Sequence, residues 1–202
     1  GILDIAPALC AFGNTIPISY LRLVPDQEAP TNVCWGNRNR SALIRVPLGW
    51  STDKDMVADL NPLERQTHQS YSDKQTFEFR SPDGSADIYL LIAGLCVGAR
   101  HGLDMPDGLE FAEKTYVDGN IFEKQNHEKQ QTLTQLPDSC EAAAEALISY
   151  TDVLLKHNVF TQRIIQGIAA KLRQFQDGDL RDGLSNDQRK TMAYVKRFIH
   201  CG

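Results

Sequence analysis

The spacing of apolar and polar residues changes once along the chain. From about residue 15 to residue 82, short β-type runs are separated by Pro, Gly and Asn, a pattern typical of short strands joined by turns. Strands are therefore predicted over residues 16–21, 41–46 and 76–80. From Asp83 onward, apolar residues recur at the three- and four-residue spacing of helices.

The third predicted strand is the clearest, because its residues alternate in character. A period of two places Phe77 and Phe79 on one face. The opposite face carries Thr76, Glu78 and Arg80. Two interpretations stay open: buried phenylalanines anchor a strand whose polar face lines a cavity, or the strand presents a solvated face with an exposed Glu and Arg.

The first predicted helix is apolar on nearly all sides and is therefore expected to be buried. Asp83 or Ser85 can cap its start, and it ends near Arg100. Residues 125–135 are polar and rich in Gln, which predicts an exposed, mobile loop. Further helices are expected over residues 109–116, from 138 to about 157, from about 161 onward and from 185 onward.

Composition and charge limit the class of partner. The 202 residues carry a net charge of -5, which argues against nucleic acid or an anionic membrane as a general partner. Five cysteines are scattered without a CxxC pair, as expected for reduced thiols in the cytoplasm. The longest apolar stretch, residues 88–99, is too short to span a bilayer. We expect a cytoplasmic protein, excised from a longer polypeptide because no initiator Met is present.

Arginines and carboxylates form the candidate site. The chain has no GxxxxGK[ST] or GxGxxG loop, no HExxH and no nucleophile elbow. What remains is a set of charged residues on short extended segments. Arginines gathered in this way are costly to hold together unless an anion neutralises them, so the set suits a substrate with several phosphates or carboxylates. Its members are Arg22, Glu28, Arg38, Arg40, Arg45, Glu78 and Arg80.

The pattern leaves the relative placement of Arg40 and Arg45 open. The two lie five residues apart, and a perfect strand would send them to opposite faces. Both can reach one ligand if Arg40 lies in the turn before the strand. Otherwise NRNRSALIR is a salt-bridged surface hairpin arm, and periodicity does not separate these alternatives.

Three motifs in this region resemble those of the glutamine synthetases. NRSALIRVP is similar to the family's nucleotide- and phosphate-binding segment, RLVPDQEAP to its flap, and QTFEFRSPDGSADIYL to the segment with a metal-ligating glutamate. The forms SPDGSADIYLLIAGL, VCWGNRNRS and VPLGW are most similar to the type III branch. The resemblance implies an α+β fold, with antiparallel strands of the catalytic sheet, the flap and a buried helix in residues 1–102 and a mainly helical region over 103–202.

The resemblance also implies an activity. It is that of a glutamate–ammonia ligase, which makes glutamine from glutamate, ammonium and ATP through γ-glutamyl phosphate, uses Mg²⁺ or Mn²⁺, and works in a homo-oligomeric ring. Carried over position by position, Arg22 and Arg80 would hold the carboxylates of glutamate. Arg40 and Arg45 would hold the phosphates of ATP and the γ-glutamyl phosphate, which makes Arg40 a catalytic residue.

The two carboxylates receive different roles from the same resemblance. Glu28 would close the glutamate site and deprotonate ammonium, and Glu78 would be one ligand of the nucleotide-side metal. One glutamate cannot hold a divalent cation, which needs several oxygen ligands, and the family's other metal ligands are not found in this sequence. Thr76 stands where many family members have an arginine, so one nucleotide contact is lost or supplied from elsewhere. We therefore expect this chain to be inactive alone.

Two further interpretations stay open at this point. The chain could belong to another γ-glutamyl-amine ligase of the same superfamily, in which an amine replaces ammonia. It could also be a non-catalytic anion-binding or assembly module, in which the arginines bind phosphate for regulation. The product formed by the full-length protein separates the first from glutamine synthesis, and nucleotide binding without turnover would favour the second.

Overall fold

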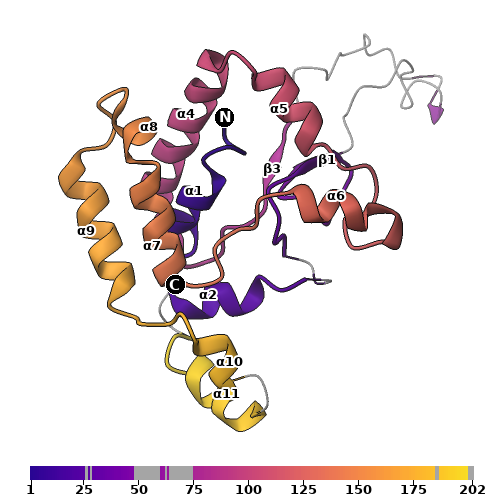
Figure 1. Cartoon of the computed structure of the whole chain (residues 1–202). Coiled ribbons are helices and arrows are strands. Elements are labelled where there is room, and N and C mark those ends of the chain that lie inside the picture. Colours follow the sequence, from indigo (N-terminus) through magenta and orange to yellow (C-terminus); the bar gives the residue numbers. More distant parts are fainter. Residues whose placement is uncertain are drawn as a thin grey trace.

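The computed structural model describes residues 1–25, 27, 29–47, 60–61, 63, 75–184 and 187–199. Helices gather around a central helix, and a small sheet lies beside them (Figure 1). The described elements are α1 (Ala6–Gly13), α2 (Pro17–Arg22), β1 (Trp35–Asn37), β2 (Ile44–Val46), β3 (Glu78–Phe79), α4 (Ile88–Asp104), α5 (Gly108–Thr115), the 3₁₀ helix η2 (Lys124–Asn126), α6 (His127–Thr132), α7 (Cys140–Ser149), α8 (Thr151–Leu155), α9 (Gln162–Arg173), α10 (Leu180–Leu184) and α11 (Gln188–Val195). The predicted α+β class is confirmed. The sheet is mixed, because β1 and β2 pair in parallel and β2 and β3 pair antiparallel.

Helix α1 is the centre of the core. All of its residues are buried, and it packs against α4, α7 and α9 (Figure 1). Phe12 stacks on Phe160 with ring centroids 5.2 Å apart. Fully buried side chains such as Leu9 and Phe12 each contribute about 1.5–3 kcal/mol to folding. The sequence predicted no element here, because a helix covered on every side shows no polar–apolar period.

Glycines on α4 let α1 approach closely. A Cβ atom on Gly94 would lie 2.6 Å from Leu9 Cδ2 and 3.1 Å from Phe12 Cδ2, and one on Gly98 would lie 3.1 Å from Ile5 Cδ1. The first distance is shorter than any ordinary carbon contact. The spacing of the two helices therefore depends on the missing side chain of Gly94.

Helix α4 is the helix that was predicted after Asp83, and the prediction that it is buried is wrong. It runs from Ile88, capped by Asp87, to Asp104, and its buried residues are Gly94, Val97 and Gly98. Its outward side carries apolar residues that are more than half exposed, namely Ile88, Tyr89, Ile92 and Leu103. The apolar composition of α4 did not indicate that α1 covers only one face of this helix. Among the described residues no single helix is long and apolar enough to cross a membrane, and α4 with α5 meets that criterion only as a pair bent by 114°.

Two other predicted segments have a different secondary structure. Residues 16–21 do not form a strand: α2 begins at Pro17, whose fixed φ suits the first turn of a helix. Residues 125–135 are not a mobile loop, since η2 and α6 occupy most of them. Their far end is held by backbone pairing, because Thr134 accepts from the N–H of Val33 at 2.8 Å.

The helices of the second half follow the predicted spacing. Helix α5 lies within one residue of its expected bounds, and α9 starts after Thr161, whose hydroxyl accepts from the N–H of Ile164. The helix expected from 138 to 157 is interrupted at Tyr150 and forms α7 and α8. The last helix was expected from Ser185, which lies outside the described residues; α11 follows an Asp187 cap. Strand β1 and helix α10 were not predicted.

A distant carboxylate completes the start of α7. Asp177 is 4% exposed, and its two oxygens accept from the backbone N–H groups of Cys140 at 2.9 Å and Glu141 at 3.1 Å. A local cap also forms, because Ser139 Oγ accepts from the N–H of Ala142 at 3.1 Å. Three of the N–H groups that a helix leaves without partners are thereby satisfied.

The described cysteines agree with the expectation of reduced thiols. Cys10, Cys34, Cys96 and Cys140 are all free, whereas Cys201 lies outside the described residues. Burial raises the pKa of the Cys10 thiol in α1 to about 12. That thiol therefore stays protonated and unreactive at neutral pH.

Adding one methyl group to α4 tests the contact between α1 and α4. We expect Gly94→Ala to lower the free energy of unfolding by about 1–3 kcal/mol, because the new Cβ overlaps Leu9 in a packed core. Gly167→Ala in α9 is the matched control: nothing lies within 4 Å of its Cβ position, so the better helix propensity of Ala should raise stability by about 0.5–1 kcal/mol. Urea titrations followed by circular dichroism measure both, and equal effects would contradict the close approach.

Candidate functional site

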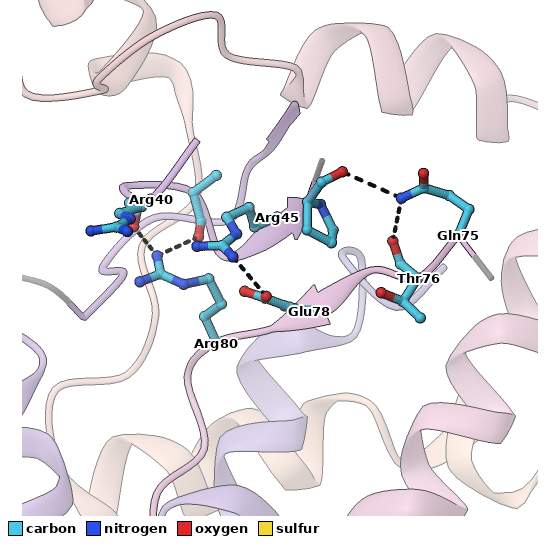
Figure 2. A network of polar contacts seen from close by, with 8 residues as sticks. Arg40, Arg45, Gln75, Thr76, Glu78 and Arg80 are labelled. Carbon is cyan, nitrogen blue, oxygen red and sulfur yellow. Dashed lines mark hydrogen bonds and ion pairs between the residues drawn. The ribbon is translucent and has the colours of Figure 1, made fainter. Parts of the chain in front are cut away.

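The pairing of β2 with β3 brings two of the predicted site residues together. In the antiparallel register Arg45 lies opposite Glu78, and Arg45 Nη2 donates to Glu78 Oε1 at 2.8 Å (Figure 2). The side chains are 24% and 42% exposed, so the pair is partly screened by solvent. The polar face of the third predicted strand therefore carries an ion pair at the surface of the sheet.

The phenylalanines of this strand do not both anchor it. Phe79 packs against the main core, but Phe77 is 55% exposed, so the interpretation in which both rings are buried does not hold for Phe77. The observed strand β3 is short, Glu78–Phe79, and Phe77 precedes it. Phe77 lies at an apolar cavity of about 300 Å³ together with Trp35 and Val46.

Arg80 holds the backbone of the loop that contains Arg40. Its own N–H donates to Leu43 O at 3.0 Å. Its guanidinium Nη1 donates to Arg40 O and, at 3.3 Å, to Ala42 O (Figure 2). A guanidinium on two carbonyl groups fixes the loop and places positive charge beside it.

The segment between β1 and β2, residues 38–43, is here named the arginine loop. Its ends are fixed by the parallel register, in which Trp35 lies opposite Ile44, so the loop must return along β1. Arg38 accordingly has a left-handed backbone, with φ 58°, and its N–H donates to Val46 O at 2.7 Å. Arg40 lies in this loop and not in β2. The condition under which Arg40 and Arg45 can reach one ligand is therefore met.

A cavity of about 600 Å³ opens beside the arginine loop. Arg38 and Arg40, both exposed, lie along one wall. The other wall is the segment 118–120, which no motif predicted. Polar side chains dominate the lining, namely those of Gln27, Asn37, Arg38, Asn39, Arg40, Ser41, Asp118 and Asn120. A cavity with two arginines and several amide groups suits an anion that has many acceptor oxygens.

Arg22 lies on another element than the strand pair β2 and β3. Arg22 ends α2, and its Nη2 donates to Ser81 O and, at 3.4 Å, to Pro82 O in the turn after β3. Arg22 is thus hydrogen-bonded to the two residues that directly follow Arg80. Glu28 lies outside the described residues.

The described residues do not fit a resident divalent cation by themselves. Among them there is no group of three or more His, Cys, Asp or Glu side chains that could hold a metal ion. Glu78 offers oxygen donors, but one of them already pairs with Arg45, and Mg²⁺ or Ca²⁺ needs several oxygen ligands. Thr76 is exposed, and its carbonyl accepts from Gln75 Nε2 at 3.0 Å (Figure 2).

Comparisons with known proteins agree in one family. A family model described as the glutamine synthetase catalytic domain matches residues 1–177. The glutamine synthetases of Frankia alni and Aquifex aeolicus are each 34% identical over 170 residues, which cover 82% of this chain and 30% of the relative. The chain thus spans less than a third of the length of these relatives. A cryoEM structure of Plasmodium falciparum glutamine synthetase has a similar fold, with a TM-score of 0.57 at 20% identity over 89% of this chain and 38% of that one.

A double-mutant cycle tests whether the pair between β2 and β3 forms in solution. We expect Arg45→Ala and Glu78→Ala to show a coupling of about 0.2–1 kcal/mol in the free energy of unfolding, since partly exposed ion pairs contribute little. The control cycle uses Lys114 and Glu110, a more exposed pair on α5, and should give a smaller coupling. Unfolding in urea measures both cycles; zero coupling between Arg45 and Glu78 would mean that the two do not pair.

Proposed function

The chain belongs to the glutamine synthetase catalytic-domain family, and we propose that it is part of an ATP-dependent glutamate–ammonia ligase. The observation that carries this proposal is the network of Arg40, Arg45, Glu78 and Arg80 on one loop and two paired strands (Figure 2). The segments VCWGNRNRS and VPLGW further support assignment to the type III branch. A homo-oligomeric ring for the full-length protein is part of the same proposal.

Arg40 and Arg45 are proposed to bind the phosphates of ATP and of the γ-glutamyl phosphate. The Nε–H of Arg45 is buried and has no hydrogen-bond partner among the described residues. A buried donor without a partner costs free energy, and a phosphate oxygen would supply the missing acceptor. The exposed Arg40 would contact the ligand from the loop side. Arginine is suited to this role because its fork of N–H groups matches the geometry of phosphate.

Arg22 and Arg80 are proposed to hold the carboxylates of glutamate. In the described structure the guanidinium of Arg22 hydrogen-bonds to backbone carbonyls just after β3, and that of Arg80 to backbone carbonyls of the arginine loop. Carbonyl oxygens carry only partial charge, so a carboxylate would compete well for the same donors. Glu28, between Pro25 and Pro30, is proposed as the gate of the glutamate site and the base that deprotonates ammonium.

The proposed reaction needs electrostatics and exclusion of water from these residues. The side-chain carboxylate of glutamate attacks the γ-phosphoryl group of ATP, and arginines offset the charge at the transferring group. Ammonia, formed by loss of a proton from ammonium, then displaces phosphate from the acyl phosphate. Water competes with ammonia at that step, so a gate such as Glu28 protects the intermediate. Glu78 is proposed as one ligand of a divalent metal, and further ligands are needed because the described residues hold no group of three or more ligating side chains.

The 202-residue chain alone is expected to make no glutamine, because a divalent cation needs several oxygen ligands and the described residues hold no group of three or more that could bind one. The measurement is glutamine formed from glutamate, ammonium, ATP and Mg²⁺, with the full-length protein that carries this sequence as the positive control. Turnover by the chain comparable to that of the control would overturn the fragment proposal. A γ-glutamyl amide made only with another amine would point to a related ligase, and ATP binding without any turnover by the full-length protein to a regulatory module.

Substitution of the two phosphate-binding arginines tests their assignment in the full-length protein. Arg40→Ala and Arg45→Ala should each remove a charge-assisted contact worth about 1.5–3 kcal/mol, which weakens ATP binding and phosphoryl transfer. Lysine at either position should rescue poorly, because the two-pronged contact is lost. Steady-state kinetics over ATP measures both effects, with Arg173→Ala on α9, an exposed arginine paired with Glu145, as control. Wild-type ATP kinetics in both alanine variants would show that the arginines do not bind phosphate.

A further inference from the structure

Asn39 stands immediately before Arg40 in the arginine loop and uses both ends of its side-chain amide. It is 6% exposed. Its Nδ2 donates to Val117 O at 3.1 Å and to Gly119 O. Its Oδ1 accepts from the N–H of Ser41 at 2.9 Å and from Ser41 Oγ at 2.7 Å. The side chain therefore joins the loop to a segment that lies far away in the sequence and also lines the cavity.

Ser41, on the other side of Arg40, continues the same connection. Its Oγ accepts from the N–H of Ile121 at 2.9 Å, so both neighbours of Arg40 are tied to residues 117–121. Strand β1 is hydrogen-bonded to that segment, because the N–H of Val117 donates to Trp35 O at 2.9 Å. Gly36 makes the approach possible: a Cβ atom there would lie 2.5 Å from Val117 O.

We propose that Asn39 and Ser41 are positioning residues, which hold Arg40 at a fixed place in the lining of the cavity, next to residues 118–120. The proposal rests on the proposed role of Arg40 in phosphate binding and adds the residues that set its geometry. No contact between the ligand and the side chains of Asn39 and Ser41 is part of the proposal. They act through the backbone of Arg40, whose carbonyl is held from the other side by Arg80.

The physical reason is the cost of ordering a long, exposed side chain. An arginine loses rotamer freedom when it binds, and a mobile backbone would add to that loss. Three attachments to the residues around Arg40 remove most backbone freedom before any ligand arrives. Displacement of a catalytic group by about 1 Å can cost roughly 100-fold in rate, so a loosened loop should bind and react poorly even with Arg40 intact.

The first test substitutes Ser41 in the full-length protein. Ser41→Ala removes the hydroxyl bonds to Asn39 Oδ1 and to the N–H of Ile121 but keeps the bond from its own N–H to Asn39 Oδ1. We expect a loss of roughly 10- to 100-fold in kcat, with weaker ATP binding. Ser41→Thr keeps a hydroxyl and should recover most of it. Ser139→Ala is the matched control, because Ser139 also makes a side-chain bond to a backbone N–H, at the start of α7. Activity of Ser41→Ala equal to that of Ser139→Ala would overturn the proposal.

The second test separates positioning from stability. A residue that acts only through Arg40 should have no further effect once Arg40 is gone. Ser41→Ala and Asn39→Asp should therefore reduce ATP affinity, measured by calorimetry, in the wild-type background and leave it unchanged in Arg40→Ala. Asn39→Asp keeps the acceptor for Ser41 but turns oxygens toward the carbonyls of Val117 and Gly119. Equal losses in both backgrounds would show a merely structural role.

The two proposals fail in different ways. If Arg40→Ala leaves ATP affinity and kcat unchanged, Arg40 does not bind phosphate, and the proposed function loses its main residue. The positioning role of Asn39 and Ser41 is then also wrong. If Arg40→Ala is defective while Ser41→Ala and Asn39→Asp match their controls, Ser139→Ala and Asn32→Ala, only the positioning role is wrong. Asn32 is a suitable control because it is also buried, at 2% exposure, and lies before β1.

Discussion

Parallel pairing of β1 with β2 is the constraint on which the candidate site depends. Parallel neighbours usually need a connection of about a dozen residues or more, but here residues 38–43 make the return alone. Such a short connection must turn sharply, which explains the left-handed backbone of Arg38 and the bond from its N–H to Val46 O. Arg40 is therefore presented from a tight turn, while Arg45 follows on the adjacent strand.

Hydrogen-bond acceptors within the fold allow several arginines to lie close together without a ligand. Three guanidinium groups have an acceptor that the fold provides: Glu78 for Arg45, loop carbonyls for Arg80, and the turn after β3 for Arg22. The carbonyl acceptors of Arg22 are neutral, so its positive charge is not offset by them. An anionic substrate would meet donors that are already oriented, which lowers the cost of reorganisation on binding.

Local signals in the sequence predicted much of this structure, and long-range contacts account for most errors. The helix spacing of the second half and the approximate starts of α7 and α9 were predicted, because helix ends are set largely by neighbouring residues. Helix α1 and the exposed side of α4 were not predicted. Whether a helix is buried on all sides or on one side depends on which helices pack against it. At the site, motifs found the arginines, but nothing in the sequence linked Asn39 to Val117 and Gly119.

The Asp177 cap on α7 has a consequence for the order in which the chain folds. The carboxylate reaches back 37 residues to the N–H of Cys140, so the first turn of α7 is complete only after α8, α9 and the following turn have been synthesised. Contacts of such sequence separation slow folding because a long loop must close before they form. On the ribosome, α7 would emerge early and frayed at its start, and would become fully paired only when residue 177 leaves the exit tunnel.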